Sequence, residues 1–178
     1  MVGTPLDILP YIRGVQLVLI GYNGYTKGSR LENDKIVREE IIRATTRVRS
    51  HMQNVFDSQF KGGNIDVARA AKQCMEECDY LIEDVGKAVS GMEHAFLSGQ
   101  RSPTNKDLKK LIKHDHDVIE MVTKGVNLAN SSEHSIATEE GNPKQFVMQT
   151  TQIISSCRGF FGERATVLAG LKQKKVKK

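Results

Sequence analysis

Residues 64–99 read NIDVARAAKQCMEECDYLIEDVGKAVSGMEHAFLSG, and this stretch decides the fold. Its apolar residues recur at spacings of three and four from Val67 to Phe96, which is typical of one face of a long amphipathic helix. Glycines stand on both sides of the stretch, at Gly62-Gly63 and at Gly99, and they limit the helix. The apolar stripe consists of Val67, Ala71, Cys74, Cys78, Leu81, Val85, Ala88, Met92 and Phe96.

Three further segments show the same periodicity, so the sequence predicts four long helices, over about 30–60, 65–98, 105–130 and 143–171. Ser29 and Glu32 have the spacing of a capping box before the first helix. Thr104 is a candidate cap for the third helix. Asn142-Pro143 starts the fourth with an asparagine cap and a proline at the first helical position. The first two connections are short, which predicts an all-α protein, an antiparallel up-down four-helix bundle.

The N-terminal segment is apolar on every side between Val15 and Ile20, and Asn23-Gly24 is a hairpin turn signal. We predict an additional short helix over about 5–22, because a lone hairpin would have no sheet to join. Helix and strand both remain open at this point. Residues 8–20 are expected to be core, and the alternative is a surface that contacts a partner or a membrane.

The charge of the chain is concentrated at its C-terminus. Lysine and arginine number 26 against 21 acidic residues, and five of the cations lie in the last seven residues without a neighbouring acid. We therefore expect a single helical-bundle domain over 1–171 and a cationic tail over 172–178. The chain has no signal-peptide pattern, no long apolar run and only three cysteines, which favours the cytoplasm, or the nucleus of a eukaryote. The tail cations are Lys172, Lys174, Lys175, Lys177 and Lys178.

A second group of cations lies around the start of the third predicted helix. The positive end of the helix dipole lies there too, so these cations destabilise the helix unless an anion compensates them. The leading hypothesis is a non-enzymatic subunit or adaptor of a larger assembly that contacts RNA or DNA, without sequence specificity, through this group and the tail. The alternative for this group of cations is that they pair with acidic residues of the same chain. The group is Arg101, Lys106, Lys109, Lys110 and Lys113.

Catalytic motifs are missing from the sequence: it has no phosphate loop, no dinucleotide-binding glycine motif and no nucleophile elbow. We expect no cofactor. Cys74 and Cys78 are four residues apart, as metal-binding thiols can be, but both lie on the apolar stripe, where packing in the core is favoured. His114, Asp115, His116 and Asp117 form the densest titratable cluster. They allow an alternative hypothesis, an enzyme or sensor that depends on a metal or a phosphoryl group.

A third hypothesis is a purely protein-binding scaffold, whose partner docks on exposed apolar surface near residues 8–20. Under both non-enzymatic hypotheses, the adaptor and the scaffold, we expect a protein partner or self-association. The polar stretch from Ser131 to Gly141 is predicted to be the longest connection between helices. We expect it to form a loop that is mobile or that binds a partner.

Overall fold

The computed structural model describes residues 9–22, 24, 30–97 and 105–169, without the side chains of 30–31, 89–97, 105–108 and 164–169. The described chain is helical and contains no strand, so the all-α prediction is confirmed. The five helices are α1 (Leu9–Gln16), α2 (Arg30–Lys61), α3 (Ile65–Leu97), α4 (Asn105–Thr138) and α5 (Pro143–Ala169).

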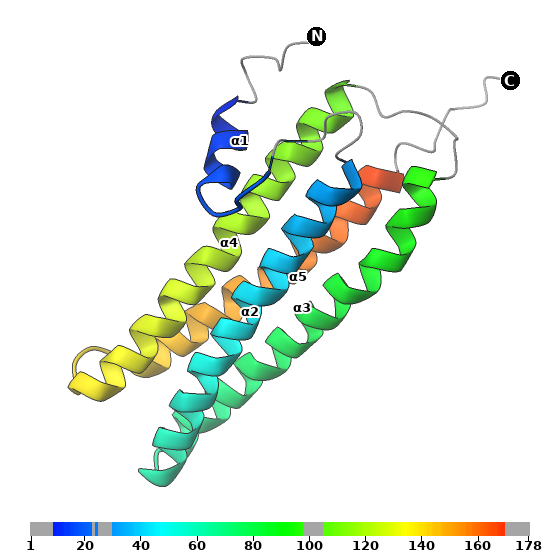
Figure 1. Cartoon of the computed structure of the whole chain (residues 1–178). Helices are drawn as coiled ribbons and strands as arrows, with labels where there is room; N and C mark the ends of the chain where they lie inside the picture. The colour runs from blue at the N-terminus through cyan, green and yellow to red at the C-terminus, as the bar shows by residue number, and fades with distance from the viewer. Residues whose placement is uncertain (1–8, 23, 25–29, 98–104, 170–178) are drawn as a thin grey trace, which may run out of the picture.

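The four long helices pack as a bundle (Figure 1). Both α2 and α5 pack against α3 and α4, so each long helix has two principal neighbours. Their apolar stripes meet in one core, in which Val48, Leu81, Val122 and Ile154 are fully buried. The α2–α3 and α4–α5 connections lie at one end of the bundle, and α1 lies beside α4 toward the other end (Figure 1).

Residue chemistry explains both short connections. After α2, the backbone N–H of Asn64 donates to the carbonyl of Gln59 at 2.9 Å, and Gly63 has a φ of 77°. A left-handed residue with these bonds is a common helix end, and glycine adopts it without steric cost. At the start of α5, Asn142 Oδ1 accepts a hydrogen bond from the Gln145 backbone at 3.1 Å, which confirms the asparagine cap.

The predicted loop over residues 131–141 is wrong, because α4 continues to Thr138. The hydroxyl groups that suggested a loop donate to carbonyls one turn earlier: Ser131 Oγ to Asn127 at 2.9 Å and Thr138 Oγ1 to His134 at 3.0 Å. Ser132 is buried and continues the inward stripe beyond Ala129. Serine and threonine that satisfy their hydroxyls in this way are tolerated inside helices.

The N-terminal helix exists and is shorter than predicted, since α1 ends at Gln16 and the chain continues through turns to Tyr22. It packs against α4. Gly14 sits directly over His116 of α4, where an added Cβ would lie 2.6 Å from the imidazole Cδ2. A larger residue at position 14 would force the His116 ring to shift.

A search of the described residues finds no helix with the length and apolarity that a membrane span requires.

Candidate functional site

The turn after α1 exposes apolar side chains. Val15 and Leu19 are buried and hold the segment against the bundle, whereas Leu17 is 89% exposed and Ile20 97% exposed. Val18 between them is also exposed. We call Leu17, Val18 and Ile20 the apolar corner. The prediction that residues 8–20 are core therefore holds for part of the segment only.

Hydrogen bonds hold the corner in this conformation. Gln16 Nε2 donates to the carbonyl of Tyr22 at 2.7 Å and closes the turn from α1. The Tyr22 hydroxyl donates to Asp115 Oδ2 of α4 at 3.2 Å, and both side chains are fully buried. Asn33 Nδ2 at the start of α2 donates to the Gly24 carbonyl at 2.7 Å. The corner is thus attached to both α2 and α4.

A buried ion pair lies one turn further along α2, where Arg38 contacts the carboxylate of Asp34. Their side chains are 5% and 0% exposed. Charges are rarely buried to this extent. The cost of removing both groups from water offsets much of the attraction between them, so the pair adds little to the free energy of unfolding.

The cluster from His114 to Asp117 does not converge on one point. His114 stacks on Phe160 of α5, with ring centroids 4.3 Å apart, and its Nε2 lies 2.8 Å from the Phe160 carbonyl oxygen. Asp115 accepts from Tyr22. His116 contacts the edge of Tyr11 at 5.3 Å between centroids and lies 3.2 Å from Asp117 through Nδ1.

One group in the described chain has the composition of a metal site. Potential ligand atoms of His116, Asp117 and Glu120 all lie within 4.8 Å of one another. Glu120 follows His116 by four residues, which places both on the same helical face. Glu120 was not among the residues predicted from the sequence, although its four-residue spacing from His116 is visible there.

The cysteines lie inside the bundle and do not join this group. Cys74 and Cys78 are fully buried, and the hydrogen bond between their thiols lowers the pKa of Cys74 and raises that of Cys78. Burial raises the pKa of Cys157 to about 12. All three are free thiols. Buried thiols of this kind behave as small apolar residues.

Three of the lysines predicted to bind a polyanion are described. Lys110 and Lys113 are exposed one turn apart on α4, and Lys109 is partly buried. The other predicted cations lie outside the described residues: the side chain of Lys106, and Arg101, Lys172, Lys174, Lys175, Lys177 and Lys178.

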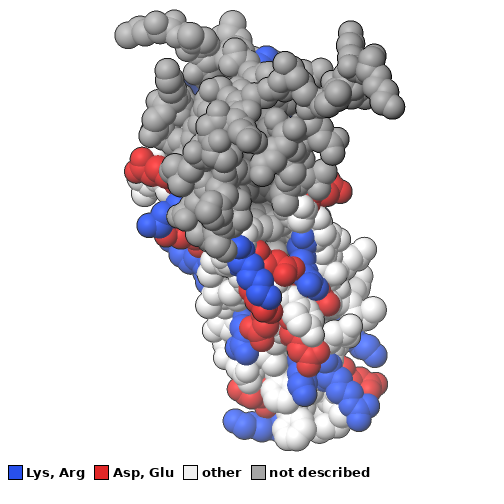
Figure 2. All heavy atoms as spheres, turned by 90° about the vertical axis from the view of Figure 1, so that its right-hand side faces the viewer, with Lys and Arg blue, Asp and Glu red and all other residues white. Residues whose placement is uncertain are grey.

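Charges on the α3 side of the bundle are mixed in sign (Figure 2). Arg49 of α2 pairs with Asp79 of α3 at 2.7 Å, and Arg158 of α5 pairs with Asp84 of α3 at 2.5 Å. Asp79 raises the pKa of Arg49 through this hydrogen bond. The described part of this face therefore presents no continuous basic surface to a nucleic acid.

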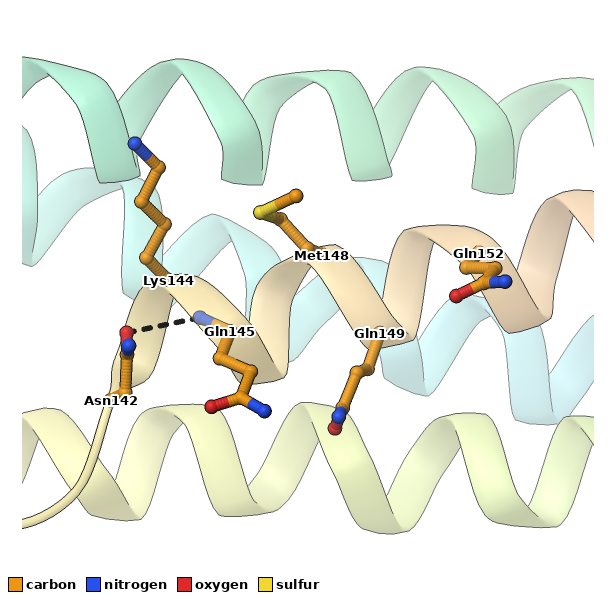
Figure 3. Close-up of a pocket in the computed structure, with 6 residues that line it drawn as sticks. All are labelled: Asn142, Lys144, Gln145, Met148, Gln149 and Gln152. Carbon is orange, nitrogen blue, oxygen red and sulfur yellow. Dashed lines mark hydrogen bonds between the residues drawn. The ribbon is translucent and has the colours of Figure 1, made fainter.

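Two open hollows flank α5. The first, of about 470 Å³, is lined by Lys144, Met148 and four side chains with amide groups (Figure 3). The second, of about 420 Å³, lies between α4 and α5 and includes Leu128 and Ile153. Gln149 and Gln152 line both hollows. Neither contains a convergent set of titratable groups typical of an active site.

Comparisons with protein-family models, with curated proteins and with solved structures found no significant match to this chain.

Proposed function

We propose that this protein is a non-enzymatic subunit or adaptor of a larger assembly, and that a protein partner docks on the apolar corner. The observation that carries the proposal is the near-complete exposure of Leu17 and Ile20 on a segment held by buried hydrogen bonds. Water-exposed apolar side chains in a fixed conformation are typical of binding surfaces. The proposal includes the antiparallel up-down order of the long helices and a cytoplasmic location.

The charges around the corner favour an acidic partner. Arg13 is exposed one helical turn before Leu17. Lys110 and Lys113 are exposed on α4, the helix against which α1 packs. A partner segment with apolar anchors and flanking carboxylates would complement both features.

Photo-crosslinking in cells tests this proposal. We expect a photoreactive amino acid at Leu17 or Ile20 to form a defined protein adduct that the second substitution Lys113→Glu weakens. Phe60, 59% exposed at the opposite end of the bundle, is the matched control position and should give no such adduct. Equal adducts at Phe60 and Leu17, or none at Leu17, would contradict the proposal.

Contact with RNA or DNA remains the second part of the adaptor proposal, supported among described residues by exposed Lys110 and Lys113. Binding of fluorescent single-stranded RNA and duplex DNA to the full chain and to a version ending at Leu171 tests it across a salt series. Binding that depends on the tail and falls steeply with salt is expected. No binding at low salt would remove the polyanion from the proposal.

A metal-dependent enzyme or sensor is the second candidate function, because His116, Asp117 and Glu120 lie together. One imidazole and two carboxylates would suit a divalent ion such as Zn²⁺ or Mn²⁺. Calorimetric titration with each ion should show binding that His116→Asn abolishes and that His134→Asn, on the exposed end of α4, leaves unchanged. Identical titrations for both variants would exclude this site.

A further inference from the structure

The outward face of α5 lacks charge. From Gln145 to Gly162 the helix has one charged residue, Arg158, whose guanidinium is turned toward α3, where it pairs with Asp84 and lies 4.9 Å from the centre of the Tyr80 ring. The exposed residues in this range are Gln145, Met148, Gln149, Gln152, Ser155, Ser156, Gly159 and Gly162.

The other long helices expose charged residues along their length. On α2 these include Glu39, Arg43 and Arg47, on α3 Arg69, Lys72 and Glu76, and on α4 Lys113, Glu120 and Lys124. Charged residues are depleted at the centres of protein interfaces, where they would have to lose their water. Among the described helices, α5 thus has the face best suited to burial.

The spacing of this face is that of a helix–helix seam. Met148, Gln152, Ser155, Gly159 and Gly162 follow one another at alternating intervals of four and three, as do the contact positions of a coiled coil. We call these five residues the α5 seam. Its C-terminal part is small, and within the described residues no atom beyond the neighbouring backbone of α5 lies within 4 Å of the Cβ positions of Gly159 and Gly162. Its N-terminal part carries Met148, which is 59% exposed.

We propose that the α5 seam binds the same seam of a second copy of this chain in antiparallel orientation. With the two-fold axis placed between Ile153 and Ile154, Met148 of one copy lies opposite Gly159 of the other. The large side chain then fills the space over the glycine. A two-fold interface uses one surface twice, so a knob and its hole must lie at equal distances from the axis, as these two residues do.

The charges at the two ends of the seam favour the same alignment. Lys144 and Glu163 are both exposed and lie at equal distances from the axis, so each lysine faces the glutamate of the second copy. A parallel arrangement would place lysine against lysine. Lys144 Nζ also lies 4.0 Å from Asp66 Oδ2, at the outer limit of an ion pair, and its side chain is 52% exposed.

The amide side chains suit a surface that binds itself. Gln145 and Gln149 extend toward α4 and border the hollows beside the seam (Figure 3). Gln152, which lines both hollows, lies beside Gln152 of the second copy in this alignment. An amide has both donors and an acceptor, so these two side chains can pair, whereas a carboxylate or ammonium group at residue 152 would repel its copy.

Sedimentation equilibrium of the full chain tests the proposal. We expect a monomer–dimer equilibrium whose Kd rises by about tenfold or more in Gln152→Glu, because two new carboxylates would lie near the axis. Gln73→Glu is the matched control, since Gln73 is exposed on α3. A chain that stays monomeric at high concentration, or equal effects of the two substitutions, would overturn the proposal.

A charge exchange tests the orientation. Lys144→Glu and Glu163→Lys should each weaken the dimer several-fold, and the two substitutions together should restore it, because the opposite charges again face one another. Additive weakening in the combined variant would refute the antiparallel alignment. Leu17→Ser with Ile20→Ser should leave the dimer Kd unchanged, so failure of the apolar corner proposal and failure of this one are distinguishable.

Discussion

Removal of one hydroxyl group measures how strongly the N-terminal segment is attached to the bundle. The Tyr22 hydroxyl donates to Asp115 at 3.2 Å, and both side chains are 0% exposed. Tyr22→Phe preserves the ring and deprives a buried carboxylate of a donor. A hydrogen bond to a charged group contributes about 1.5–3 kcal/mol, so we expect a loss of about 2 kcal/mol in the free energy of unfolding.

For a chain of this length, about 2 kcal/mol corresponds to a fall in Tm of about 4–8 °C. Urea and thermal unfolding, followed by far-ultraviolet circular dichroism, measure both quantities. Tyr80→Phe is the matched control, because it removes the same hydroxyl from a side chain that is 47% exposed and lies at the surface. If Tyr22→Phe and Tyr80→Phe lose the same small amount, the hydrogen bond does not anchor the segment and the reasoning is refuted.

Three further predictions concern the glycines and a buried thiol. Gly86→Ala, at an exposed position of α3, should stabilise the protein by about 0.5–1 kcal/mol, because a Cβ there meets no atom of the described residues outside the neighbouring helix backbone within 4 Å and glycine is a poor helix former; unchanged urea unfolding would contradict this. Gly14→Ala should instead loosen α1, since the new Cβ would lie 2.6 Å from His116, and faster hydrogen exchange confined to residues 9–22 would detect it. Because burial raises the Cys157 pKa to about 12, the unfolded chain loses this proton first as the pH rises above about 8.5; stability should fall by about 2 kcal/mol between pH 8 and 10, and by that much less in Cys157→Ala. Parallel pH profiles for the two proteins would show that Cys157 does not contribute.

The long helices could be predicted from the sequence because their signals are local. The stripe from Val67 to Val85 is buried as expected, and Asn142 caps α5. The predicted end of α4, near residue 130, is too early, because the stretch from Ser131 to Gly141 is polar in the way that loops often are. The hydroxyls of Ser131 and Thr138 instead donate to carbonyls of the preceding turn. Ala129 and Ser132 are buried in the bundle, and their packing favours the helix over a loop.

The N-terminal segment was harder to predict, because its outcome depends on residues far away in the chain. Periodicity alone does not distinguish exposed Leu17 and Ile20 from buried Val15 and Leu19 within a run in which five of the six residues are apolar. Tyr22 finds its acceptor 93 residues later in the sequence.

The candidate metal group was found only in part. His116 and Asp117 were singled out, and Glu120 joins them through the ordinary helical spacing. His114 and Asp115, their neighbours in sequence, turn toward Phe160 and Tyr22 instead. Successive residues on a helix point about 100° apart, so a run of four titratable residues is divided among several neighbours.

The attachment of α1 to α4 has a consequence for the order of folding. The α2–α3 and α4–α5 hairpins form through contacts that are close in the sequence, whereas α1 must find α4 after most of the intervening chain is in place. Contacts of such long sequence separation form late, because closing a long loop costs chain entropy before any contact is gained. We therefore expect the apolar corner to be among the late surfaces to assemble, and a partner that recognises it to bind completed molecules in preference to nascent ones.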